Sequence, residues 1–175
     1  MTNDKNAVAT SVMELRQSFD QSFARAPQAN DQELVDLLSI RVAGALHALR
    51  LSQLSGLHAC GQIVPLAGPV PELLGMIGLR GKIVPVYSLR LLLGYPAGEH
   101  PGWLALVGGN EPVGLAFDGL GGHRRIPKKD ISAAERAKGA AAHVHEVAQL
   151  GGAARPIIDL VSVCEGIKKK GMSES

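Results

Sequence analysis

The chain has 175 residues, of which 46% are hydrophobic and 3% are aromatic, and its formal net charge is +2 at pH 7. One ordinary domain or two very small ones, with an aliphatic core, are therefore expected, whereas so few aromatics and so little charge disfavour binding to nucleic acid or to an anionic membrane. The two cysteines, Cys60 and Cys164, lie far apart and favour free thiols in a reducing compartment.

Neither a secretory leader nor an apolar run long enough to span a bilayer is present. These features predict a cytoplasmic protein without direct membrane insertion. The first expected element is an amphipathic helix over residues 11–25. Ser11 and Glu14 have the spacing of a capping box, and apolar residues recur on one face. We assign residues 1–30 to an amino-terminal extension whose apolar face packs either on the protein's own body or on a partner.

Short runs of alternating apolar residues begin near Leu34, and glycines and prolines separate them. Residues 107–112 and 149–159 have the composition of hairpin connections. This pattern favours small barrels over an open parallel sheet. Residues 131–143 are rich in alanine and predict a mobile loop or a marginal helix, and the polar tail is expected to fray.

The segment 73–94 is almost entirely apolar and contains no histidine, cysteine or aspartate. Residues 73–75 predict the end of a helical turn with Gly75 as its cap. Two strands should follow, joined by a tight turn at Arg80 and Gly81, because glycine readily adopts a positive φ.

Two further residues shape the second half of this segment. Pro85 cannot donate a backbone hydrogen bond, so its strand is expected to lie at a sheet edge or at a bulge. Ser88 is a suitable N-cap for a short helix that ends at Gly94.

Candidate catalytic and metal-binding patterns are weak. His143 and His145 would share one face of a strand, either as two metal ligands or as a solvated surface, and no further ligands have motif spacing. Residues 75–82 do not match a phosphate-binding loop. The basic run of His123–Arg125, Lys128 and Lys129 predicts a solvated loop or a contact with an acidic protein. We therefore expect no catalytic residues, no metal and no cofactor.

The run GPVPELLGMIGLRGKIVPVYSLRLLLG, residues 68–94, resembles the signature of the CheW-like domain, the adaptor fold of bacterial chemotaxis arrays. EPVGLAFDGLGG (111–122) and ARPIIDLVSV (154–163) are similar to two further strand motifs of that family. The resemblance covers about residues 33–166. It implies a mainly β fold of two intertwined five-stranded SH3-like β-barrels with short helices, here with an added N-terminal helix. We place this domain at residues 31–168 and a polar tail at 169–175.

The resemblance also implies a non-enzymatic adaptor in a two-component chemosensory pathway. Such an adaptor couples the cytoplasmic tip of methyl-accepting chemoreceptors to the regulatory domain of a CheA-type histidine kinase, without nucleic acid, and is recruited to receptor arrays. The positions that match the family's partner contacts are Gly75, Arg80, Gly81, Leu54, Gly56 and Arg90.

Three departures from the family pattern keep an alternative open. Gly56 stands where many members have Glu, Gly78 where the pattern prefers Asn, and Ser88 where it prefers Asp. The missing acid at residue 88 is expected to leave Arg90 without an internal partner. The alternative is a divergent member that binds only receptor or only kinase and insulates or modulates a pathway. A small enzyme or a nucleic-acid-binding barrel is a third, disfavoured hypothesis, because the ionisable groups are scattered.

Overall fold

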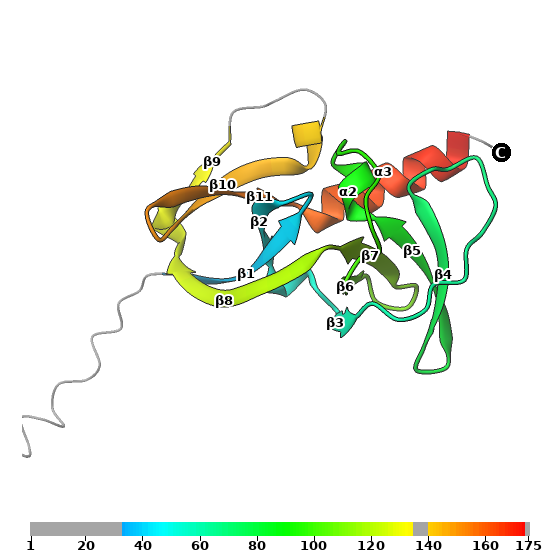
Figure 1. Ribbon diagram of the computed structural model, residues 1–175. Coiled ribbons are helices and arrows are strands. Elements are labelled where there is room, and N and C mark those ends of the chain that lie inside the picture. Colours follow the sequence, from blue (N-terminus) through cyan, green and yellow to red (C-terminus); the bar gives the residue numbers. More distant parts are fainter. Residues whose placement is uncertain (1–32, 135–139, 174–175) are drawn as a thin grey trace, which may run out of the picture. The chain divides into compact units, whose positions relative to one another are not determined.

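The computed structural model describes residues 33–134 and 140–173, which form two β-sheets and a few short helices (Figure 1). The helix expected over residues 11–25 lies outside the described residues.

The first sheet combines strands from both ends of the described chain. In spatial order its strands are β8 (Gly119–Pro127), β1 (Leu34–Val42), β2 (Ala45–Arg50), β11 (Ala153–Ile158), β10 (Val144–Leu150) and β9 (Ile131–Ala133). The hairpin expected within residues 149–159 is confirmed, because β10 and β11 pair antiparallel. The sheet has six strands rather than five, since β9 pairs with β10 where a loop or a helix was expected. The basic run His123–Arg125 likewise lies on a strand, β8, and the expectation of a loop there was wrong.

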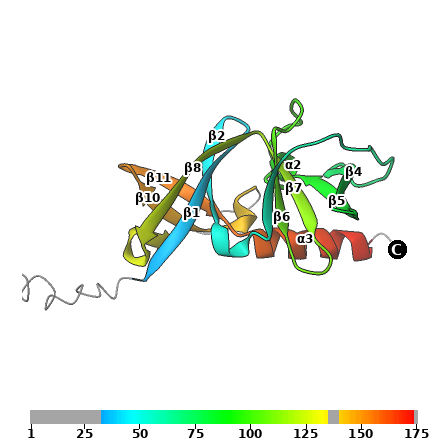
Figure 2. The same cartoon turned by 90° about the horizontal axis from the view of Figure 1, so that it is seen from below.

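The second sheet comes from one continuous stretch of chain. In spatial order its strands are β3 (Gly56–Ala59), β6 (Trp103–Val107), β7 (Val113–Phe117), β5 (Lys82–Ser88) and β4 (Leu73–Leu79). The hairpin expected between β6 and β7 is confirmed. The chain thus leaves the first sheet after β2 and returns to it with β8, which intertwines the two sheets (Figures 1 and 2). The predicted mainly β architecture in two units is confirmed.

Short helices connect the strands. They are η1 (Leu51–Gln53), α2 (Leu89–Leu92), η2 (Lys128–Asp130), η3 (Ala140–His143) and the longer α3 (Leu160–Ser173). The predicted N-cap is confirmed, since the Ser88 hydroxyl accepts a hydrogen bond from the Leu91 N–H at 3.3 Å. The expectation that the tail frays was wrong for residues 167–173, because α3 continues to Ser173. Within this part of α3, Lys170 Nζ lies 2.5 Å from Oε1 of Glu72, the residue that precedes β4. This lysine holds the pKa of Glu72 below its ordinary value.

A central apolar cluster joins the two sheets. Strand β1 supplies Leu38, Ile40 and Val42 to it, while Phe117 and Val163 enter from β7 and α3. Leu37 points to the opposite face of β1, into a separate core inside the first sheet, and a third core fills the second sheet. Because successive strand residues face opposite sides, β1 is buried on both faces at this point.

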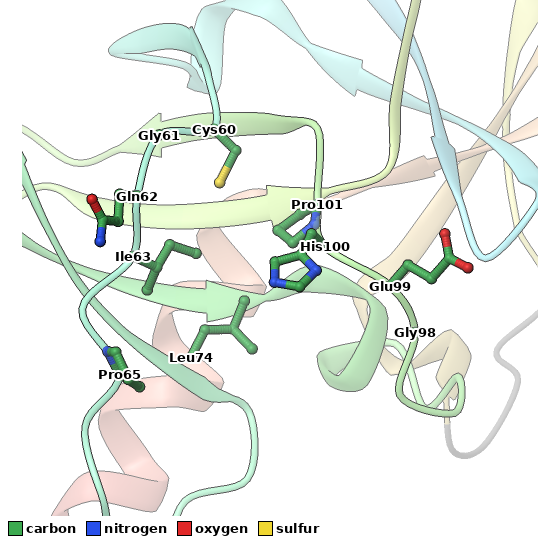
Figure 3. Close-up of a pocket in the computed structure, with 10 residues that line it drawn as sticks. All are labelled: Cys60, Gly61, Gln62, Ile63, Pro65, Leu74, Gly98, Glu99, His100 and Pro101. Atoms are coloured by element: carbon green, nitrogen blue, oxygen red, sulfur yellow. The ribbon is translucent and has the colours of Figure 1, made fainter.

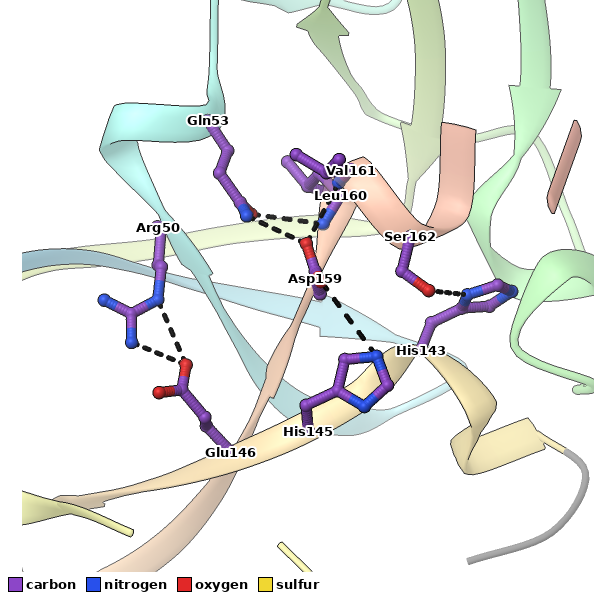
Figure 4. Close-up of polar contacts among 9 residues, drawn as sticks. All are labelled: Arg50, Gln53, His143, His145, Glu146, Asp159, Leu160, Val161 and Ser162. Carbon is purple, nitrogen blue, oxygen red and sulfur yellow. Dashed lines mark hydrogen bonds and ion pairs between the residues drawn. The ribbon is translucent and has the colours of Figure 1, made fainter. Parts of the chain in front are cut away.

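Polar contacts fix the start of α3 against η1 (Figure 4). The Gln53 amide donates to Asp159 Oδ1 at 2.9 Å, and its carbonyl oxygen accepts from the Leu160 N–H at 3.1 Å. Asp159 Oδ1 also accepts from the Val161 N–H, as an N-cap does. Gln53, more than a hundred positions earlier in the chain, therefore satisfies the first N–H of α3, and Asp159 satisfies the next one.

The two histidines near this helix do not share a strand face. His143 lies in η3, where its Nδ1 is 2.9 Å from the Ser162 hydroxyl, whereas His145 lies in β10, with Nε2 4.0 Å from Asp159 Oδ2 (Figure 4). The expectation of a shared face was wrong because β10 begins only at Val144.

Gly75 is not a helix cap but a buried position inside β4. Its φ is 145°, and an added Cβ would lie 2.8 Å from the carbonyl carbon of Val64 and 2.9 Å from the Cα of Pro65. The Val64 and Met76 backbones exchange two hydrogen bonds at this crossing, of 2.8 and 2.9 Å. Glycine here allows a second backbone to lie directly on the outer strand of the sheet.

The expectation that the strand of Pro85 lies at a sheet edge or a bulge was wrong, because β5 lies between β7 and β4 and the register shift with β4 does not fall at Pro85. Pro85 pairs with Met76 of β4 on one side. On the other side, pairing with β7 starts only at Val86. The position without an N–H therefore precedes the first pair between β5 and β7. For this reason an interior strand tolerates proline there.

Gly75→Ala is expected to lower the free energy of unfolding by about 2 kcal/mol or more, because the methyl group meets rigid backbone at a positive φ. Gly78→Ala is the matched control. It lies on the same strand with nothing within 4 Å of its Cβ position, and should change stability by about 0.5 kcal/mol or less. Urea unfolding of both variants measures the difference in stability. Equal stabilities would contradict the close approach of the Val64 and Pro65 backbone to Gly75.

A buried histidine predicts a pH-dependent stability. His47 on β2 is 5% exposed, its Nε2 lies 3.4 Å from the Tyr95 hydroxyl, and burial lowers its pKa from the ordinary 6.5. The unfolded chain therefore binds this proton more readily, so stability is full above the ordinary pKa and falls as the pH drops below it. We expect the free energy of unfolding to decrease between about pH 7.5 and about pH 5.5.

His47→Gln should reduce this decrease, and the exposed His100→Gln should leave it unchanged. Some dependence should remain, because burial also lowers the pKa of His143. Denaturant unfolding at a series of pH values checks the prediction, which fails if His47→Gln keeps the full dependence.

Candidate interaction surface

Arg80 and Gly81 form the two-residue turn of the β4–β5 hairpin. Their φ angles are 48° and 78°, and Leu79 pairs with Lys82 on either side. Two positive φ values in a two-residue loop are typical of the type I′ turn, whose twist matches that of the strands. Arg80 is exposed, and among the described residues its side chain has no hydrogen-bond or ion-pair partner. The predicted turn is confirmed.

A surface hollow of about 330 Å³ lies beside this turn, and we call it the cationic hollow. Its polar lining includes Arg80, Lys82 and His58. Its apolar lining consists of Leu57, Leu79, Val84, Leu106 and Pro112. No carboxylate lines it. Positive charge above an aliphatic floor suits a partner surface that presents apolar side chains flanked by acidic ones.

The structure brings two of the expected contact positions together. Gly56, the first residue of β3, lines the cationic hollow with Arg80, and Gly81 is exposed in the same turn. Leu54 lies two residues before Gly56 but packs against the central cluster. Gly75 is buried under Val64, so its role is in the backbone crossing.

Arg90 does not line this hollow, and its side chain is held by contacts with other residues of the same chain. Its Nε donates to the carbonyl oxygen of Pro96 at 2.7 Å, and its Nη1 lies 3.5 Å from Asp118 Oδ2. Asp118 Oδ2 also accepts from the N–H of Ala43, a turn residue with a φ of 53°. The expectation that Arg90 lacks an internal acidic partner was wrong, because Asp118, distant in sequence, takes the place of an acid at Ser88.

Sequence patterns did not single out His58, Lys82 or Leu106 as members of the hollow. The position of Lys82 directly after the Arg80–Gly81 turn could have identified it as a member of the hollow. No local sequence feature identifies His58 or Leu106, because they come together only through the antiparallel pairing of β3 with β6, which are far apart in sequence.

A second hollow of about 530 Å³ lies between residues 60–65 and 98–101 (Figure 3). The ring of His100 and the side chains of Ile63 and Leu74 turn toward the same space, whereas Glu99 extends away from them (Figure 3). Cys60 also lines this hollow, and burial raises the pKa of its thiol. A raised pKa keeps the thiol protonated, which is opposite to the activation of a nucleophile.

Among residues 33–134 and 140–173, no three His, Cys, Asp or Glu side chains are grouped as metal ligands. No helix among the described residues has the length and hydropathy needed to cross a membrane.

Comparison with known proteins identifies the family. A search among curated proteins gave no match. The crystal structure of the scaffolding protein TtCheW from Thermoanaerobacter tengcongensis is similar in fold, with a TM-score of 0.64 at 20% sequence identity, over 71% of this chain and 88% of that one. A family model described as CheW-like domain matches residues 36–168, and the chain therefore belongs to the CheW-like family of non-catalytic scaffolding adaptors in chemotaxis signalling.

Proposed function

We propose that this protein couples the cytoplasmic tips of chemoreceptors to the regulatory domain of a CheA-type histidine kinase, in the cytoplasm at receptor arrays. The observation that carries the proposal is the exposed Arg80 at the cationic hollow, whose side chain has no hydrogen-bond or ion-pair partner among the described residues. Such an arginine offers five donors to a partner carboxylate, and no contact with another described residue has to be broken first.

The receptor tip is the proposed occupant of the cationic hollow. By position, Arg80 and Gly81 match the family's turn near the receptor-facing groove, which supports this proposal. The hollow offers an apolar lining and positive charge that suit such a contact. The type I′ turn restricts the backbone of Arg80, so its position is set before the partner arrives.

Coupling requires another surface for the kinase. The second hollow is a candidate, because the segment that lines it, residues 60–65, also carries apolar side chains on the surface. Val64 is 61% exposed, and Leu66, which follows this segment, is 48% exposed. Apolar side chains so exposed on neighbouring positions are typical of protein contacts. Each contact is expected to be weak alone and to become firm in an array, where linked sites raise the effective concentration.

A second candidate function is favoured by Gly56. A glutamate at this position would lie in the cationic hollow and offer a carboxylate to a receptor cation, which glycine does not. A chain without that contact would bind the kinase, but it would bind a receptor that presents the cation only weakly. Such a protein would insulate or modulate a pathway.

Separate binding measurements distinguish these two functions. The purified chain is titrated with the cognate kinase regulatory domain and, independently, with a receptor-tip fragment. Binding to both supports coupling, binding to one supports the second candidate, and binding to neither contradicts both.

Arg80→Ala is expected to weaken receptor-tip binding by about tenfold, since a charge-assisted hydrogen bond contributes roughly 1–3 kcal/mol. The free energy of unfolding should stay within about 1 kcal/mol of the wild type, because the side chain is exposed. Lys169→Ala, an exposed change on α3, should alter neither quantity. Unchanged binding with a large loss of stability would show that Arg80 has a structural role instead.

Gly56→Glu is expected to strengthen binding to a receptor tip that presents a cation by about fivefold or more, through one new charged contact. The change fits, because an added Cβ would lie 3.2 Å from the ends of two side chains, His58 and Leu106, which are able to move. Gly56→Gln has the same size without the charge and should not strengthen binding. Equal effects of the two variants, measured by calorimetry, would contradict a charge effect.

A further inference from the structure

Strand β8 is the longest outer strand of the two sheets as described. It has nine residues, whereas the other outer strands have three in β9, four in β3 and seven in β4. The outer side of β4 is already engaged by the Val64–Met76 bridge. Within the described residues β8 pairs only with β1, so the outer side of its backbone has no strand partner there.

The regular part of this edge is the segment 123–127. There the register with β1 runs without interruption from Leu34↔Pro127 to Leu38↔His123. A bulge follows at Gly121 and Gly122, opposite Ser39, and it limits the usable edge at that end. His123, Arg124 and Arg125 are all exposed. An edge of this length has room for a short added strand.

Positive charge covers the segment, and only part of it is neutralised inside the protein. Asp36 on β1 contacts both His123 Nε2, at 2.7 Å, and Arg125 Nε, at 3.0 Å. Arg124 points to the other face of the strand, since it pairs with Leu37 rather than with Asp36. Neither Arg124 nor Lys129 has a hydrogen-bond or ion-pair partner among residues 33–134 and 140–173.

We infer that β8 binds an extended acidic segment of a partner protein by strand addition along residues 123–127. The backbone of the edge provides hydrogen bonds, which any extended chain satisfies. Specificity comes from the side chains. A carboxylate on the added strand beside Arg124 pairs with an otherwise free guanidinium, because neighbouring residues on adjacent strands face the same side.

Charge selects an acidic partner over a second copy of this chain. Two β8 edges placed side by side would bring the arginines of both copies together, and like charges on facing strands destabilise the pairing. The same cations also protect the edge from indiscriminate pairing, which is a common use of charge on outer strands. Only a segment that compensates the charge gains from this edge. The inference does not depend on the cationic hollow, which lies on the other sheet.

The test uses the full chain and labelled synthetic peptides as long as β8, nine residues. One peptide alternates Glu and Thr, a second has the same sequence and charge with every backbone nitrogen methylated, and a third alternates Lys and Thr. Fluorescence anisotropy measures affinity, hydrogen exchange locates protected amides, and sedimentation measures the mass of the chain alone. The variants are Arg124→Glu and, as a matched charge reversal on an exposed helix position, Lys169→Glu. Thermal unfolding verifies that both variants remain folded.

The Glu–Thr peptide should bind and should slow exchange in residues 123–126, and Arg124→Glu should weaken it by about tenfold or more. Lys169→Glu should have no effect, and the Lys–Thr peptide should not bind. Equal binding of the N-methylated peptide would overturn strand addition, because a methylated backbone nitrogen cannot donate a hydrogen bond to the edge. Absence of binding, protection elsewhere, or a dimer formed through β8 would overturn it as well. None of these measurements involves receptor or kinase, so their failure leaves the coupling proposal standing.

Discussion

The burial of β1 on both of its faces is the constraint on which the rest of this structure depends. Leu37 closes the core of the first sheet, while Leu38 and Ile40 enter the cluster that joins the first sheet to the second and to α3. A shift of one residue in the register of β1 would exchange these faces and break two cores together. The sheets are therefore held in one arrangement, and surfaces built from both ends of the chain keep fixed positions.

Internal pairing of charges leaves a small set of cations available to partners. Arg50 binds Glu146, Arg90 lies beside Asp118, and Arg125 binds Asp36. Arg80 and Arg124 are exposed without such partners among the described residues. A free guanidinium on a fixed turn or strand keeps its full capacity for a carboxylate, whereas a paired one would first have to give up its contact. This contrast supports the proposed recognition roles of Arg80 and Arg124 and indicates a structural role for Arg90.

Much of the local structure could be predicted because it depends on neighbouring residues. The Arg80–Gly81 turn, the Ser88 cap and the hairpin from β6 to β7 follow from turn chemistry and from period-two patterning, and all three are present. The mispredicted features depend on distant residues. The local sequence around Gly75 suggests a helix cap, and the need for glycine there becomes clear only from the close approach of the Val64 backbone. The basic residues of β8 likewise suggest a loop, and they form a strand because they pair with β1. The candidate site divides in the same way, with Arg80 predictable and His58 and Leu106 not.

The family, the mainly β class and the arginine turn can be recognised from the amino-acid sequence, because motif spacing, alternation and glycine placement are properties of short segments. Which charges are neutralised depends instead on the three-dimensional fold. Asp118 replaces the acid missing at Ser88, Asp36 occupies Arg125, and no carboxylate reaches Arg80 among the described residues. Ion pairing requires atoms a few ångströms apart, and in this fold those atoms come from elements that are distant in sequence, such as Arg90 in α2 and Asp118 between β7 and β8.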